Sequence, residues 1–192
     1  MNADAQRVLD FWYGAAGSPQ HGTRRAEWFK KSTAFDGEVR KGFLAVYEDL
    51  AAGQADAWAA EPRELLAKII VLDQFPRNMF RDTPRAFATD GLALASAEML
   101  LRKGWDTVLA PIERWFAYLP FEHAEDLALQ RRAVELFGAL AADPVYADLL
   151  DWAQKHYVII ERFGRFPHRN AILGRPSTPE EAAFLKQPGS SF

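Results

Sequence analysis

Phe163-Gly164-Arg165-Phe166-Pro167-His168-Arg169-Asn170 is the stretch from which the fold of this chain can be worked out. It has an earlier echo in Leu72-Asp73-Gln74-Phe75-Pro76-Arg77-Asn78-Met79-Phe80-Arg81, which repeats Phe-Pro followed by Arg-Asn. Two isoleucines precede each copy, and Thr-Pro follows each, at residues 83–84 and 178–179. We interpret both copies as one arrangement, in which an amphipathic helix ends at Phe-Pro, a basic loop follows and Thr-Pro begins the next helix. The arrangement marks a position for a functional site without naming a reaction or partner.

Proline positions divide much of the chain into helices. Pro62, Pro84, Pro111, Pro144 and Pro179 each stand just ahead of a helical pattern, where the fixed φ favours the first turn. With the spacing of apolar residues, they predict helices over residues 5–13, 35–52, 63–75, 84–103, 112–119, 122–141, 145–163 and 179–186. No window alternates apolar and polar residues as a strand does, so we predict an all-α fold.

The short connections between these segments predict antiparallel helical hairpins. Ala133, Phe137 and Leu140 keep the spacing of the second helix of a tetratricopeptide repeat, although the first-helix pattern is absent. We therefore expect eight to ten helices, stacked in a tetratricopeptide-like (TPR-like) array of degenerate repeats. Residues 1–192 are expected to form one domain, because a chain of 192 residues that is 49% hydrophobic can bury a substantial core.

Composition excludes several classes of protein. The net charge of −3 gives no overall basic excess, so we expect no nucleic-acid partner. The chain has no cysteine, which excludes disulfides and thiolate metal sites and fits a reducing cytoplasm. No run approaches the ~20 apolar residues of a membrane span, and residues 1–10 lack the pattern of a signal peptide. We expect a cytoplasmic protein without a membrane partner, and the sequence says nothing about its oligomeric state.

Several segments match the pattern of a known bacterial family. They are Leu9 to Gly14, Trp28 to Lys30, Leu72 to Arg81 with Thr83 to Phe87, Tyr118 to His123, Phe163 to Gly174 and the tail Pro188 to Phe192. Through them the chain resembles the family called domain of unknown function 924 over nearly its whole length. The resemblance implies an all-helical, tetratricopeptide-like fold, and the family has no established activity that could be carried over.

Asp73 is the first candidate site residue. It lies four residues after Ile69 and seven after Leu66, so the buried stripe of its helix ends in a carboxylate. A buried carboxylate needs a partner, and Arg77 at i+4 is the obvious one. If Pro76 turns Arg77 away, the arginines of the second loop are the alternative partners. Two interpretations stay open, a structural Asp–Arg pair joining the two echoing loops or a catalytic carboxylate.

Phe121-Glu122-His123-Ala124-Glu125-Asp126 is the second candidate, placed by the prediction at the start of the helix over 122–141. Acids in a first turn complement the helix dipole, which explains the carboxylates without any function. A cation is disfavoured there, so His123 is expected to stay neutral and able to accept a proton or ligate a metal. A carboxylate–histidine metal site would need His168 to join Glu122 and Asp126. Because HExxH and other diagnostic spacings are absent, we expect no metal.

The loop after residue 163 is the third candidate. Arg165, His168, Arg169 and Asn170 offer more donors than can pair locally, which suits an anion cradle. The alternative is a polar staple, in which these side chains cap carbonyls at the end of the preceding helix. His156 lies on an apolar flank and is interpreted as a core or rim residue. Tryptophans 12, 28, 58, 105, 115 and 152 are interpreted as core filling.

Two classes of function stay open. No Gly-rich phosphate loop, Gly-x-Ser-x-Gly elbow or Cys–His pair is present, and we expect no cofactor. One class is an enzyme with hydrolase-like acid/base or metal-assisted chemistry on an anionic small molecule, using His123, His168, Glu122 and Asp126. The favoured class is a helical-repeat module, because a solenoid offers a concave surface without catalytic groups. It would bind an acidic peptide or small anion where the two echoing loops approach each other, through Asp73, Arg77, Asn78, Arg81, Arg165, His168, Arg169 and Asn170.

Overall fold

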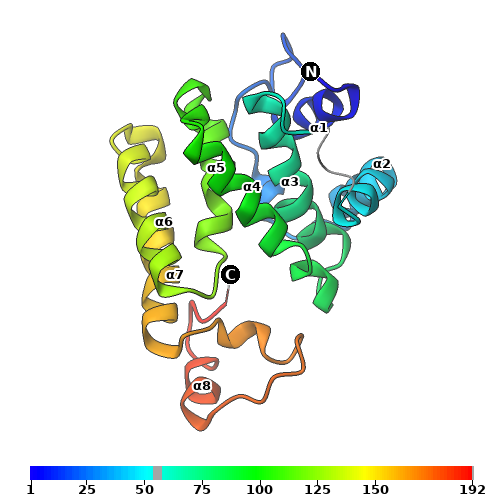
Figure 1. Ribbon diagram of the computed structural model, residues 1–192. Helices are drawn as coiled ribbons and strands as arrows, with labels where there is room; N and C mark the ends of the chain where they lie inside the picture. The colour runs from blue at the N-terminus through cyan, green and yellow to red at the C-terminus, as the bar shows by residue number, and fades with distance from the viewer. Residues whose placement is uncertain (54–57, 192) are drawn as a thin grey trace. The chain divides into compact units, whose positions relative to one another are not determined.

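The computed structural model describes residues 1–53 and 58–191, so Phe192 of the matching tail lies outside the described residues. Over that part of the chain it has eight α-helices and no strand, which confirms the all-α prediction (Figure 1). The α-helices are α1 (Ala3–Tyr13), α2 (Thr33–Ala51), α3 (Pro62–Met79), α4 (Asp90–Arg102), α5 (Pro111–Glu122), α6 (Leu127–Leu140), α7 (Ala147–Phe163) and α8 (Pro179–Phe184). Short 3₁₀-helices are η1 (Ala26–Trp28), η3 (Pro84–Phe87), η4 (Trp105–Val108), η5 (Pro144–Tyr146) and η6 (Pro167–Arg169).

The chain forms two compact units, residues 1–81 with 85–120 (unit 1) and residues 82–84 with 121–192 (unit 2). The single domain expected from the sequence stays a prediction. No helix within the described residues is long and apolar enough to cross a membrane.

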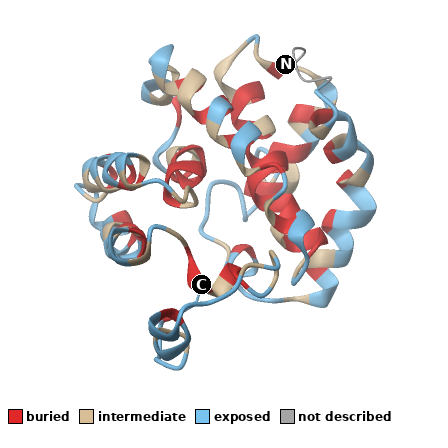
Figure 2. Cartoon of the chain, turned by 60° about the horizontal axis from the view of Figure 1, so that its bottom comes forward, coloured by how far each residue is buried: buried red, intermediate tan, exposed pale blue. Residues whose placement is uncertain are grey.

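Helix α3 is the centre of unit 1. It packs against α1, α2 and α4 (Figure 1). Because neighbours cover it on several sides, it is buried almost all round, as is the second half of α5, whereas α2 and α7 expose one side (Figure 2). Leu66, Ile70 and Phe75 are all completely buried, as the apolar spacing of this segment predicts.

Trp12 anchors an aromatic core in unit 1. Its ring stacks on Trp28 at 5.8 Å between centroids and meets Phe75 at 5.6 Å and Phe116 at 5.4 Å. Four of the six tryptophans are buried, as predicted. Trp152 on α7 is 46% exposed, so its interpretation as core filling is wrong. The Lys155 ammonium lies 4.2 Å from its ring centroid.

Pro76 does not end a helix, which corrects the predicted boundary at residue 75. Helix α3 continues through Pro76 to Met79. A proline has no N–H, so it cannot bond the carbonyl four residues earlier, that of Leu72. The Thr89 hydroxyl donates to this carbonyl at 2.6 Å instead. The helix therefore tolerates the proline because a side chain from a later segment replaces the missing donor.

Other predicted boundaries also shift. The helix predicted over 84–103 is split into η3 and α4, and the one over 112–119 runs on through Pro120 to Glu122. The helix predicted over 122–141 begins only at Leu127. Pro144 starts η5 ahead of α7, and Thr178 forms with Glu181 the capping box that the sequence predicts for α8.

Unit 2 is built on the pair α6 and α7, which lie side by side (Figure 1). Its core includes Ile159, Ile160 and Phe166. Phe184 of α8 meets the ring of Phe163 at 5.0 Å, which packs α8 against the end of α7. Gly164, in the left-handed conformation with φ of 68°, caps α7 and turns the chain into the loop that carries Phe166 and η6.

Candidate functional site

The stretch from Phe121 to Asp126 connects α5 to α6 and does not form the first turn of a helix, which corrects the prediction. Glu122 is the last residue of α5, and Asp126 is the N-cap of α6, where its carboxylate accepts the Ala128 and Leu129 N–H groups at 2.8 and 3.0 Å. His123 therefore follows the carbonyl end of α5. The helix dipole there favours a cation, so the predicted reason for a neutral His123 is wrong.

Side chains from two other segments fix the turn that carries His123. Gln130, completely buried on α6, donates its amide to the carbonyls of Glu122 at 2.6 Å and Ala124 at 2.8 Å. Arg169 Nη1 donates to the carbonyl of His123 at 3.1 Å. Three successive carbonyls at the end of α5 thus have donors, and part of the role of Arg169 is to cap this helix.

His156 of α7 is the buried centre of the site. Its Nδ1 lies 2.9 Å from the carbonyl oxygen of Trp152 and 3.2 Å from Oε1 of Glu122. Both side chains are at most 8% exposed. A carbonyl oxygen only accepts, so Nδ1 carries the proton, and the neutral ring keeps an unprotonated Nε2.

The electrostatics of this site keep His156 neutral. Burial lowers the pKa of His156 from 6.5 to about 3, against the opposing effect of its bond to the Trp152 carbonyl. Positive charge at His123, Arg169 and His168 lowers this pKa further. At pH 7, Glu122 Oε1 therefore lies 3.2 Å from a neutral imidazole, and the contact is not an ion pair.

Two histidine rings and the Arg169 guanidinium lie around the completely buried ring of Phe166. His156 meets this ring edge-on at 5.6 Å, and the His168 ring lies 5.6 Å away. The guanidinium carbon of Arg169 lies 4.4 Å from the Phe166 centroid, and the rings of His123 and His156 are 6.4 Å apart. Three of the four histidines of the chain and Arg169 therefore form one group, the His–Arg cluster (His123, His156, His168, Arg169).

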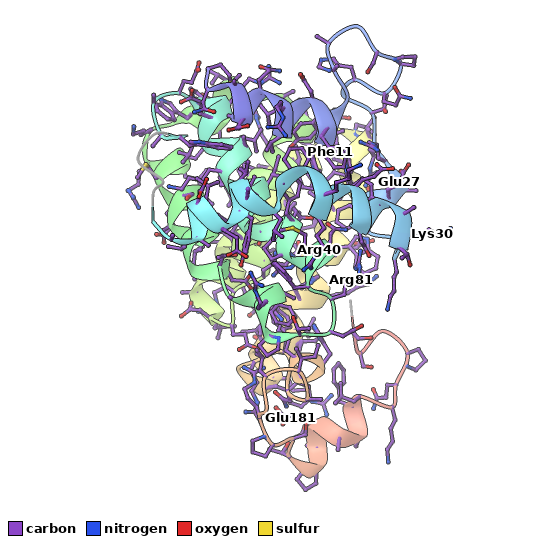
Figure 3. The ribbon with its side chains drawn as sticks, turned by 90° about the vertical axis from the view of Figure 1, so that its right-hand side faces the viewer. Phe11, Glu27, Lys30, Arg40, Arg81 and Glu181 are labelled. Carbon is purple, nitrogen blue, oxygen red and sulfur yellow. The ribbon has the colours of Figure 1, made fainter. Side chains whose placement is uncertain are left out.

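The remaining predicted residues of this loop form a network that is satisfied internally. Arg165 donates to both carboxylate oxygens of Glu181 on α8, at 2.6 and 2.8 Å (Glu181 is labelled in Figure 3). The hydrogen bond from Arg165 is the main cause that lowers the pKa of Glu181 to about 2. Asn170, completely buried, donates to Ser177 Oγ at 3.1 Å and to Glu181 at 3.3 Å. For Arg165 and Asn170 the geometry agrees with the polar staple.

A second ion pair fastens the same loop, and sequence reasoning did not identify it. Arg175 binds both carboxylate oxygens of Glu125, at 2.6 and 2.9 Å, and also donates to Asn170 Oδ1 at 3.0 Å. Glu125 accepts the Phe166 N–H at 2.8 Å. Burial raises the pKa of Glu125, but the bonds from Arg175 and Phe166 outweigh it, so its pKa lies below 4.5.

Asp73 in unit 1 is completely buried and pairs with Arg77 of its own helix. Arg77 Nη1 lies 3.6 Å from Asp73 Oδ1, and the same guanidinium binds both oxygens of Asp90, at 2.8 and 3.0 Å. Gln74 donates to Asp73 Oδ2 at 2.6 Å. Helix α3 continues through Pro76, so Arg77 stays at the i+4 position and is not turned away.

Asn78 and Arg81 both bind Asp36 of α2. Arg81 donates to the two carboxylate oxygens at 2.6 and 2.8 Å, and Asn78 donates at 2.8 Å. Arg81 is labelled beside α2 in Figure 3. Burial raises the pKa of Asp36, but these donors outweigh it and lower the pKa below 3.8. The two echoing segments belong to different units, so their predicted approach stays a prediction.

His156 is buried on α7, as its interpretation as a core or rim residue predicts. The available signal was a polar side chain within the apolar stripe that contains Ala153 and Ile160, because such a residue needs a buried partner. The sequence predicts its partner, Glu122, in the first turn of a helix over 122–141. In the structure Glu122 is the last residue of α5 instead. Within residues 1–53 and 58–191, no three His, Cys, Asp or Glu side chains are arranged to hold a metal ion.

Comparisons with known proteins place the chain among uncharacterised relatives. A family model described as "Bacterial protein of unknown function (DUF924)" matches residues 8–189. A solved structure of a protein of unknown function from Agrobacterium tumefaciens is 41% identical, with a TM-score of 0.84, and the match covers 96% of this chain and 97% of that one. Among curated proteins, none matches this chain.

Proposed function

The chain belongs to the DUF924 family of bacterial proteins of unknown function, and from this premise we propose that it binds a small anionic ligand, carrying a phosphate or carboxylate, at its His–Arg cluster. The proposal keeps the anion-binding function expected from the sequence and moves its centre. The centre is His123, His156, His168 and Arg169 in unit 2, rather than the arginines of both echoing loops.

The observation that carries the proposal is the gathering of Arg169 and three imidazoles around the buried ring of Phe166. Arg169 also donates to the carbonyl of His123, which fixes the guanidinium beside these imidazoles. Burial is the largest cause of the lowered pKa of His156, and the positive charges of His123, Arg169 and His168 lower it further. A bound anion would relieve the repulsion among these groups.

The ion pairs in unit 1 argue for a structural role there. Asp90 accepts two hydrogen bonds from Arg77, and Asp36 accepts two from Arg81. An anion at these arginines would have to displace an internal carboxylate. We therefore propose that Asp73, Arg77, Asn78 and Arg81 stabilise unit 1.

We also propose that the helical hairpins stack in a TPR-like manner and that the protein acts in the cytoplasm. Consecutive helices pack in the pairs α3 with α4 and α6 with α7, as a repeat array requires. An acidic peptide is the larger ligand that such an array would suit, and its side chains would offer the His–Arg cluster the same carboxylates.

Thermal melts with phosphate, citrate, nucleotides and acidic peptides test the proposal. A ligand at 100 times its dissociation constant adds about 2.7 kcal/mol to native stability. We expect one of these anions to raise the melting temperature of the wild type. Arg169→Gln and the double variant Arg165→Ala with Arg169→Ala should remove the shift, while Arg162→Gln, an exposed arginine paired with Glu180, should keep it.

Absence of a shift with every anion would reject the site. So would a shift of equal size in Arg169→Gln and in the wild type. Because Arg169 also caps α5, each variant is compared with itself in the absence of ligand, so a general loss of stability does not affect the result.

A second candidate function is acid–base catalysis on an anionic small molecule. The observation in its favour is the Glu122–His156 contact of 3.2 Å, because a buried carboxylate beside an imidazole is a pairing that general acid–base catalysis uses. Turnover of aryl phosphate and aryl carboxylate esters by the wild type, lost in His156→Gln and kept in Arg162→Gln, would support it. No turnover by the wild type would reject it for these substrates.

A further inference from the structure

A pocket in unit 1 lies apart from the residues proposed above. Its volume is about 290 Å³, at the small end of the range of ligand sites. The apolar part of its wall comes from Val108, Ala110 and Ile112, and the polar part from Tyr13, His21, Arg63 and Glu113. Neither sequence motifs nor the His–Arg cluster account for this combination.

Arg63 is the only cation among the lining residues whose charge does not depend on pH. Its Nε lies 3.1 Å from Glu113 Oε1, but this buried N–H makes no hydrogen bond to the described residues. Glu113 is held from the other side, because its Oε2 accepts the Ala110 N–H at 3.0 Å. The Nη1–Nη2 edge of Arg63 makes no hydrogen bond within the described chain, and the side chain keeps 41% exposure. Glu113 thus positions the Arg63 guanidinium so that its Nη1–Nη2 edge can donate two hydrogen bonds to a ligand.

His21 adds a second oriented polar group. Its Nδ1 lies 2.8 Å from the carbonyl oxygen of Gly14, which can only accept, so Nδ1 carries a proton. Tyr13, whose side chain is 98% buried, contributes a phenol to the same lining.

We infer that this pocket binds a small organic carboxylate. The carboxylate would take the planar Nη1–Nη2 edge of Arg63, whose fork geometry matches two carboxylate oxygens. The apolar body of the ligand would lie on Val108 and Ile112. Inorganic phosphate has no apolar part, so it would leave this wall exposed to water. The pocket therefore differs in ligand class from the His–Arg cluster. The inference does not rest on the proposed function.

Calorimetric titration of the full chain with benzoate, and with benzamide as its neutral isostere, tests the inference. We expect benzoate to bind and benzamide to bind at least tenfold more weakly, because hydrogen bonds between charged partners exceed those of a neutral amide. Arg63→Gln should weaken benzoate binding at least tenfold. Arg102→Gln, an exposed arginine 3.7 Å from Glu98, should bind like the wild type.

Val108→Trp gives a second variant that leaves every charge in place and fills the mouth of the pocket, because Val108 is 72% exposed. It should also abolish benzoate binding, whereas Arg169→Gln should not change it. The inference is overturned if the wild type does not bind benzoate, if benzamide binds equally well, or if Arg63→Gln and Val108→Trp both bind like the wild type.

Discussion

The Thr89 hydroxyl donates at 2.6 Å to the carbonyl oxygen of Leu72, which is the carbonyl that Pro76 leaves without its helical donor. Thr89 is 4% exposed, so water does not replace this bond easily. One side chain outside α3 therefore supplies the donor that Pro76 lacks, in the helix that carries Asp73 and Arg77.

Thr89→Val should lower the free energy of unfolding by about 1–3 kcal/mol, because it leaves a buried carbonyl without a donor. Pro76→Ala restores an N–H that can bond Leu72 within the helix. The double variant should therefore lose less stability than the sum of the two single variants. Urea unfolding of all four proteins measures this coupling, and additive losses would contradict the role given to Thr89.

Asp73→Ala should cost about 3 kcal/mol, because it removes a completely buried carboxylate and leaves Arg77 with Asp90 but without its partner in the same helix. Chemical denaturation measures the loss. Asp4→Ala is the matched control, since Asp4 is 48% exposed and pairs with an exposed arginine. A loss below about 0.5 kcal/mol for Asp73→Ala would mean that Asp90 alone compensates Arg77.

His156 should make the chain less stable at acid pH. In the unfolded chain His156 takes up a proton near pH 6.5, whereas in the folded chain it does so only near pH 3. The stability that depends on a neutral His156 is therefore complete above about pH 6.5. It is lost progressively as the pH falls from about 6.5 toward about 3, with a limiting slope of about 1.4 kcal/mol per pH unit. Unfolding of wild type and His156→Gln across this range should show the slope difference.

The same titration can be followed at the histidine side chains by NMR. His156 should keep the signals of a neutral ring with its proton on Nδ1 well below pH 6.5. A midpoint for His156 near 6.5 would contradict the burial and the charge environment described for it.

Glu181→Gln should loosen α8, because this carboxylate completes the capping box with Thr178 and holds Arg165. Its lowered pKa means that this stabilisation is present above about pH 4.5 and is lost as the pH falls toward about 2. Hydrogen exchange should become faster over residues 178–184. Glu180→Gln is the neighbouring control, since Glu180 is 64% exposed, and equal exchange in both variants would contradict the prediction.

Local signals in the sequence were sufficient to predict the helices and many of their starts. Pro62, Pro111 and Pro179 each begin an α-helix, because a proline in a first turn acts through its own backbone. The burial of Asp73 followed from its place in an apolar stripe, which is also a local property. Motifs along the whole chain were sufficient to identify the family.

Tertiary structure alone decided which helices continue through a proline and which charges are matched. Whether Pro76 breaks α3 depends on Thr89, a donor 13 positions later that is placed by the packing of another segment. Arg81 meets Asp36 across 45 positions and Arg175 meets Glu125 across 50. Hydrogen bonds and ion pairs act over a few ångströms in space, and sequence spacing does not give those distances between helices. The sequence therefore determined the set of basic residues around the echoing loops, and the fold decided that Arg165 and Arg81 hold internal carboxylates while Arg169 lies among the histidines.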